Sequence, residues 1–168
     1  YRQLRSMVEQ HVGRINGRFT APGNDVPVHY LYRGLSPQQL AAYYAFADGM
    51  LVTPLIDGMN LVCKEYVTVQ QAHGGAGVLI LSEFTGAADE LSQAVLCNPF
   101  DTEGLSYRIE QALSLAPEAR RKSLATMAEH VRTHDVHAWV SGQLADITAR
   151  GGNANAARPR RSRAAGRR

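Results

Sequence analysis

Cysteine and long apolar runs are both scarce in this 168-residue sequence. Only two cysteines are present, which excludes a disulfide framework and a four-cysteine zinc site. No apolar stretch approaches the ~20 residues that cross a bilayer, so the sequence predicts no membrane-spanning helix. No Gly-x-Gly-x-x-Gly run follows any predicted strand, which argues against a dinucleotide-dependent dehydrogenase.

Acidic residues are absent from the end of the chain, where arginine is abundant. Residues 149–168 contain seven of the 18 basic residues and none of the 15 acidic residues. The preceding 148 residues therefore carry 11 basic and 15 acidic side chains, a net charge of −4. We expect a disordered Arg-rich tail over 149–168 and an acidic body that has no charge reason to bind nucleic acid.

The rest of the sequence has the balance of a globular protein, with 45% apolar and 20% charged residues, and its length fits one domain over residues 1–148. Short apolar runs alternate with segments of helical periodicity, which predicts an α/β fold with a parallel, Rossmann-like sheet. The expected strands are residues 28–32, 49–53, 78–81 and 94–97. The expected helices are residues 1–15, 37–47, 59–71, 87–91, 117–133 and 136–148, together with a helix that residues 98–101 cap and that ends at about residue 115.

Ligands of open parallel sheets bind beyond the carboxyl ends of the strands, which directs attention to the loop after residues 49–53. Gly58 permits close approach of a ligand to the backbone, and the next four residues are expected to place their amides in a first helical turn. Such unpaired donors at the positive end of a helix suit a phosphate or diphosphate. The four residues are Met59, Asn60, Leu61 and Val62.

Asp57 and Glu65 flank these amides. On one helix they would lie about 12 Å apart along the axis, where they can hold hydroxyls at the two ends of a nucleotide sugar. Another interpretation stays open from the residues alone: Asp57 is a helix cap and Glu65 a solvated helix residue. The second strand-end loop, residues 84–86, can either approach the ligand or pack against the first loop.

Residues 53–67, TPLIDGMNLVCKEYV, closely resemble the donor-site motif of the trehalose-6-phosphate synthase family. Two positions depart from the family pattern, because Ile56 stands where arginine is usual and Cys63 where alanine is usual. Further stretches that resemble the family occur in family order at residues 13–19, 28–31, 79–88 and 95–101.

The resemblance implies a retaining glucosyltransferase of the GT-B type, in which two Rossmann-like domains face each other across a cleft. Glucose passes from a nucleotide-diphosphate glucose to glucose 6-phosphate and gives trehalose 6-phosphate. The resemblance also implies roles for single residues. Asp57 holds a glucose hydroxyl, Gly58, Met59 and Asn60 lie along the sugar and diphosphate, Leu61 and Val62 face the phosphates, Glu65 holds the ribose hydroxyls, and Leu35 lies beside the nucleobase.

The chain begins at Tyr1, and the family's acceptor-binding half and basic donor loop find no counterpart in it. We therefore expect the C-terminal, donor-binding part of such an enzyme, truncated at its front and partnered by an upstream N-terminal half. A cytoplasmic protein without cofactor or metal is expected, with a homo-oligomer left open. The alternative is a non-catalytic nucleotide-sugar-binding or regulatory module of a synthase complex.

Overall fold

The computed structural model describes the backbone of residues 1–156 and the side chains of residues 1–149. Its contacts divide the chain into two units, Tyr1–Gln38 and Gln39–Arg168. The units are described separately below.

The first unit contains one long helix, α1 (Arg2–Phe19), and an extended segment. The side chain of Asn16 donates to the carbonyl oxygen of Val28 (2.9 Å) and accepts from its amide (3.0 Å). The Arg5 guanidinium lies 4.0 Å from the ring centre of Tyr32. The strand predicted over residues 28–32 is therefore wrong, because these residues pair with side chains of α1 and with no neighbouring strand in the described part of the chain.

A parallel sheet organises the second unit, with the strands in the order β1 (Gly49–Val52), β2 (Val78–Ser82) and β3 (Val95–Cys97). Gly49 lies beside Val78, and Ile80 beside Val95. These strands match three of the four expected runs, and their parallel pairing confirms the predicted α/β class.

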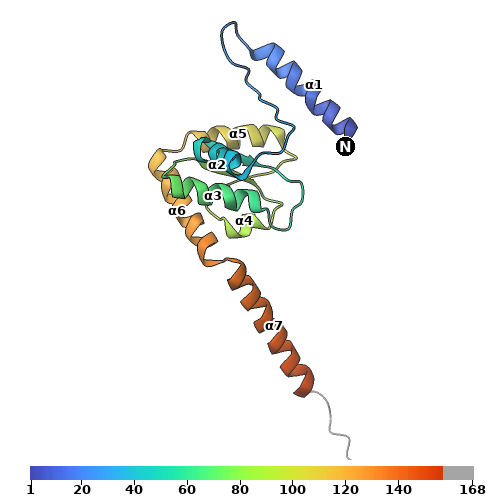
Figure 1. The fold of residues 1–168 in the computed structure, drawn as a ribbon, viewed down its shortest axis with the longest axis vertical. Coiled ribbons are helices and arrows are strands. Elements are labelled where there is room, and N and C mark those ends of the chain that lie inside the picture. The colour runs from blue at the N-terminus through green and yellow to red at the C-terminus, as the bar shows by residue number, and fades with distance from the viewer. Residues whose placement is uncertain (157–168) are drawn as a thin grey trace, which may run out of the picture. The chain divides into compact units, whose positions relative to one another are not determined.

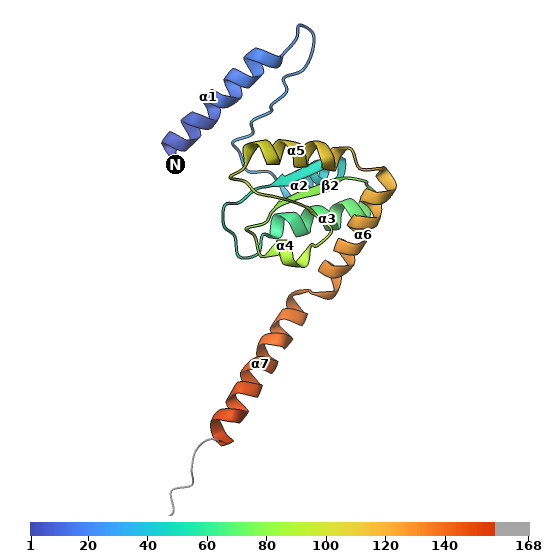
Figure 2. The ribbon, with the colours of Figure 1, turned by 180° about the vertical axis from the view of Figure 1, so that it is seen from behind.

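Both faces of β2 are buried, and its side chains alternate between two apolar clusters. Leu79 and Leu81 pack into a cluster that also holds side chains of α3 (Leu61–His73) and α6 (Pro117–Thr133). Val78 and Ile80 instead pack with Ala112 of α5 (Thr102–Leu113). Helices therefore cover both sides of the sheet, which explains why β2 is a continuous apolar run. Figure 1 and, from behind, Figure 2 show α3 and α5 on the two sides.

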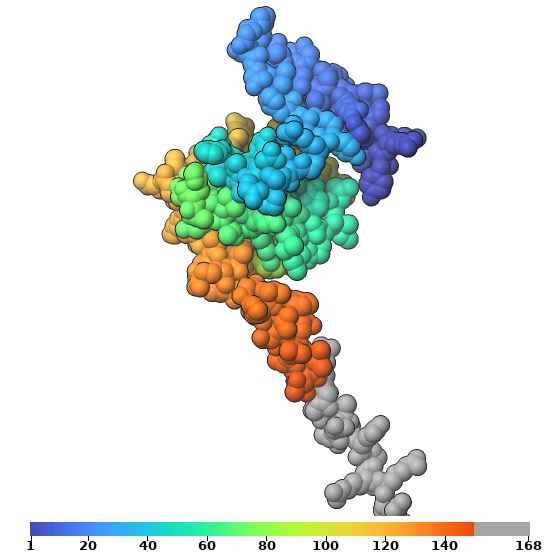
Figure 3. All heavy atoms as spheres, viewed as in Figure 1, coloured from blue at the N-terminus to red at the C-terminus, as the bar shows by residue number. Residues whose placement is uncertain are grey.

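In the part of the second unit that the structure describes, six helices accompany the sheet in sequence. Figure 3 shows how α2 and α3 share one face of the unit. The bounds are α2 (Pro37–Phe46), α3 (Leu61–His73), α4 (Ala87–Glu90), α5 (Thr102–Leu113), α6 (Pro117–Thr133) and α7 (Val136–Ala156).

Helix α7 ends later than the predicted end at residue 148, and its described side chains, through residue 149, are all exposed. The Arg-rich tail predicted as disordered lies largely outside the described residues and stays a prediction. None of the helices in the described part of the chain has the length and apolar character needed to span a membrane.

A buried glutamine of α3 joins α2 to the sheet. The Gln70 side chain is 1% exposed. Its Nε2 group donates to the carbonyl oxygens of Tyr44 (2.6 Å) and Ala47 (3.0 Å), at the end of α2. Its Oε1 atom accepts from the amide of Gly77 (3.0 Å), just before β2. One side chain thus satisfies carbonyls that a helix end leaves without intrahelical partners.

We predict that Gln70→Leu lowers the free energy of unfolding by about 2 kcal/mol or more, because it leaves several buried backbone groups without a hydrogen bond. Gln71→Leu, at the exposed neighbouring position, is the matched control and changes it by less than about 0.5 kcal/mol. Urea unfolding of the two variants measures the difference. Equal stabilities would contradict the assigned role of Gln70.

Candidate functional site

The loop between β1 and α3 is organised by the carboxylate of Asp57. Its Oδ1 atom accepts from the amide of Met59 (3.1 Å), and its Oδ2 atom accepts from the side-chain amide of Asn60 (2.9 Å). The hydrogen bond from the Asn60 side chain and, to a smaller extent, the one from the Met59 amide hold the pKa of Asp57 below its usual range. At neutral pH the carboxylate is therefore ionised and fixed, and each oxygen keeps a lone pair for a further donor.

Asn60 sets the beginning of α3. It has a φ of 69°, a left-handed conformation that asparagine tolerates better than most residues. Its Oδ1 atom accepts from the amide of Cys63 (3.1 Å), so Asn60 is the N-cap and the helix begins at Leu61.

This start corrects the predicted one. Met59 and Asn60 precede the helix, and the Met59 amide is already bonded to Asp57. Of the four amides expected in the first turn, those of Leu61 and Val62 remain, and helix geometry leaves them without intrahelical acceptors. The candidate anion site therefore has fewer free first-turn amides than the sequence predicted.

The second strand-end loop packs against the first. The Asp57 amide donates to the carbonyl oxygen of Phe84 (3.1 Å), and the Gly86 amide donates to that of Asp57 (3.0 Å). The Thr85 hydroxyl donates to the carbonyl oxygen of Met59 (3.3 Å). The structure thus shows that residues 84–86 pack against the first loop. Asp57 and Thr85 form a parallel bridge beyond the ends of β1 and β2, next to the candidate site.

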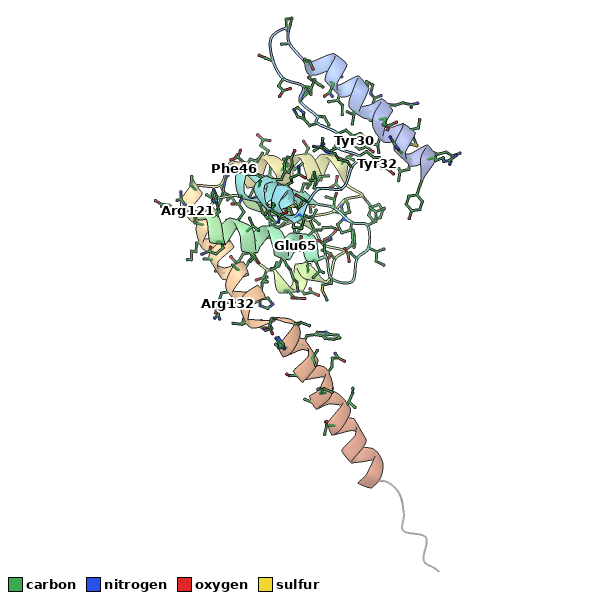
Figure 4. All side chains as sticks on the ribbon, viewed as in Figure 1. Tyr30, Tyr32, Phe46, Glu65, Arg121 and Arg132 are labelled. Carbon is green, nitrogen blue, oxygen red and sulfur yellow. The ribbon has the colours of Figure 1, made fainter. Side chains whose placement is uncertain are left out.

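Glu65 lies in the second turn of α3 and is exposed. Its Oε2 atom accepts a hydrogen bond from the hydroxyl of Tyr44 (3.2 Å), so its carboxylate faces the α2 side of the unit (Figure 4). Asp57 belongs to the loop and not to the helix, so the expected 12 Å spacing along one helix axis does not describe this pair. The two carboxylates still lie on either side of the Leu61 and Val62 amides in the chain.

Two neighbouring residues of α3 have structural roles. The Lys64 ammonium pairs with Glu90 of α4 at 2.6 Å. The side chain of Cys63 is completely buried, and burial raises the pKa of its thiol to about 11. A thiol with such a pKa is protonated at neutral pH and is a poor nucleophile.

Leu35, the candidate nucleobase contact, lies in a different unit from the other candidate residues. Leu35 is half-buried and belongs to the first unit, whereas the loop from Asp57 to Asn60 belongs to the second, so its role beside the nucleobase stays a prediction. No sequence motif identified Tyr44 or Gln70 as residues that support the site. In the sequence, each is only a polar side chain among apolar positions of a predicted helix.

We predict that Gly86→Ala lowers the free energy of unfolding by about 1–3 kcal/mol, because its added methyl group would overlap the carbonyl oxygen of Gly58. Gly58→Ala is the matched control on the opposing loop, where the methyl group would meet no heavy atom within 4 Å. We expect it to change stability by less than about 0.5 kcal/mol. Urea unfolding compares the two, and a tolerated Gly86→Ala would show that the loops are not tightly paired.

Comparison with known proteins identifies relatives along almost the whole chain. The family model of glycosyltransferase family 20 matches residues 1–149. A trehalose-6-phosphate synthase from Mycobacterium avium (strain 104) is 49% identical over 144 residues, which cover 86% of this chain and 29% of that protein. The chain thus spans less than a third of the length of this curated relative.

Solved structures give the same result. A structure from E. coli bound with UDP-2-fluoro glucose is 36% identical, with a TM-score of 0.81 over 88% of this chain and 32% of that one. An alpha,alpha-trehalose-phosphate synthase from Burkholderia xenovorans in complex with glucose-6-phosphate is 38% identical, with a TM-score of 0.80 over the same shares. Sequence, fold and loop motif agree, and the chain belongs to glycosyltransferase family 20.

Proposed function

We propose that the chain forms the donor-binding, C-terminal part of a retaining trehalose-6-phosphate synthase, which transfers glucose from a nucleotide-diphosphate glucose to glucose 6-phosphate. The observation that carries the proposal is the start of α3, where the Leu61 and Val62 amides are uncapped and the carboxylates of Asp57 and Glu65 flank them in the chain. Solved relatives support these substrates, because one is bound with UDP-2-fluoro glucose and another is in complex with glucose-6-phosphate.

The two amides bind the diphosphate of the donor. The N-terminus of α3 carries a partial positive charge, and Leu61 and Val62 point their N–H groups outward from the first turn. As the bond from the sugar to the diphosphate breaks, negative charge grows on the leaving group, and fixed donors stabilise it without reorganisation. The basic donor loop expected upstream would add to this stabilisation.

The loop binds the sugar. Asp57 accepts a hydrogen bond from a glucose hydroxyl through a lone pair that Met59 and Asn60 leave free. Gly58, which has open space where a side chain would begin, lets the sugar approach the backbone. Fixed in this way, the anomeric carbon is oriented toward the acceptor, and orientation of this kind lowers the barrier without a covalent step.

The remaining donor contacts are assigned to Glu65 and Leu35. Glu65 accepts from the ribose hydroxyls, and Leu35 lies beside the nucleobase. Departure of the diphosphate and attack by the acceptor on the same face of the sugar retain its configuration, and no nucleophilic side chain is required. The buried Cys63 thiol takes no part.

The proposed partners are glucose 6-phosphate and an acceptor-binding N-terminal half, and the 168-residue chain alone is expected to be inactive. We place the enzyme in the cytoplasm. The alternative is a non-catalytic module that binds the nucleotide sugar.

We predict that this chain completes an active enzyme when it replaces the matching region of the M. avium relative. Trehalose 6-phosphate formation from UDP-glucose and glucose 6-phosphate is the measurement, with the unmodified relative as the positive control. An inactive but folded chimera that still binds UDP-glucose would support the non-catalytic module. A folded chimera that does not bind it would overturn the proposed function.

In the active chimera, we expect Asp57→Ala to lower kcat/KM for the donor by about 10²-fold or more, because a charge-assisted contact to the sugar is lost. Asp89→Ala removes an exposed carboxylate of α4 and is the matched control, with little change expected. Steady-state kinetics at saturating glucose 6-phosphate separate the two variants. Similar kinetics for both would remove Asp57 from the reaction.

A further inference from the structure

Tyr44 of α2 is held in place on three sides. Its side chain is 6% exposed, its ring meets that of Tyr66 edge to face with centroids 6.1 Å apart, and its carbonyl oxygen accepts from Gln70 at 2.6 Å. A tyrosine has two side-chain torsions, so few contacts are needed to fix its hydroxyl. That hydroxyl lies 3.2 Å from the Oε2 atom of Glu65.

The direction of this hydrogen bond is settled by charge. Burial, and then the neighbouring Glu65 carboxylate, raises the pKa of Tyr44 above its usual value. The phenol is therefore protonated at neutral pH and donates to Glu65. A hydrogen bond to a charged acceptor is stronger than one between neutral groups.

We propose that Tyr44 is a positioning residue that holds the Glu65 carboxylate in place for the ribose hydroxyls and thereby sets the preference for ribose over deoxyribose nucleotides. The inference rests on the proposed function, in which Glu65 contacts the ribose. Tyr44 belongs to a different helix, α2, and itself contacts neither the sugar nor the diphosphate.

The geometry gives the two oxygens of Glu65 different tasks. Oε2 is bonded to Tyr44, and no hydrogen bond to Oε1 occurs within the described part of the chain. A free glutamate on an exposed helix face loses considerable rotamer freedom when it binds a ligand. The bond from Tyr44 restricts that freedom before binding, so the remaining lone pairs of the carboxylate are presented to the vicinal diol at a lower entropic cost.

The test uses the chimera with the M. avium relative and two inhibitors, UDP and 2′,3′-dideoxy-UDP. Tyr44→Phe is expected to raise the Ki of UDP about tenfold and to leave that of the dideoxy compound within about twofold. The donor KM rises similarly while kcat is unchanged, because the ribose contact is the same in the ground and transition states. Tyr43→Phe, an exposed tyrosine on the same helix, is the matched control.

A double-mutant cycle identifies the route of the effect. Glu65→Ala is expected to raise the Ki of UDP, and adding Tyr44→Phe to it is expected to change nothing further. Equal losses for UDP and the dideoxy compound, or an additive double variant, would assign Tyr44 a purely structural role and overturn this inference while the proposed function stands. A folded chimera that fails to bind UDP would overturn both.

Discussion

Two hydrogen bonds to one carboxylate fix the turn on which the site depends. The Asp57 carboxylate accepts hydrogen bonds from the Met59 amide and the Asn60 side chain, and Asn60 in turn accepts one from the Cys63 amide and caps α3. The helix therefore begins after a residue in the left-handed conformation, and the cap leaves the amides of Leu61 and Val62 without a hydrogen-bond acceptor. In the proposed function, Asp57 thus both binds the sugar and shapes the proposed diphosphate site, so its loss would affect both.

A second set of contacts connects this turn to the rest of the unit. The loop before α4 pairs with Asp57 through the backbone, which ties the site to the end of β2. On the other side of α3, Gln70 joins the end of α2 to the residue before β2, and Tyr44 reaches Glu65. Buried polar groups of this kind specify one arrangement of α2 and α3, because any other arrangement leaves them unsatisfied.

The sequence predicted what apolar runs and helix signals determine locally. The strands β1, β2 and β3 were found because short apolar runs bounded by turn residues allow few other assignments. The segment 28–32 is also rich in apolar and aromatic residues but is not a strand, since a strand requires a neighbouring strand and the Asn16 side chain instead pairs with the backbone of Val28. The start of α3 was placed too early because the left-handed conformation of Asn60 is not visible in a motif. The roles of Gln70 and Tyr44 depend on contacts between α2 and α3, which no local pattern encodes.

In the proposed function, the first-turn amides of α3 bind the donor diphosphate. The most direct measurement is a titration of the 15N-labelled 168-residue chain with UDP-glucose, followed by the shifts of individual backbone amides. We expect the largest changes at Leu61 and Val62 and smaller ones at Met59, whose amide already donates to Asp57. Saturable binding that leaves the amide shifts of Leu61 and Val62 unchanged, or no binding by the folded chain, would contradict this binding mode.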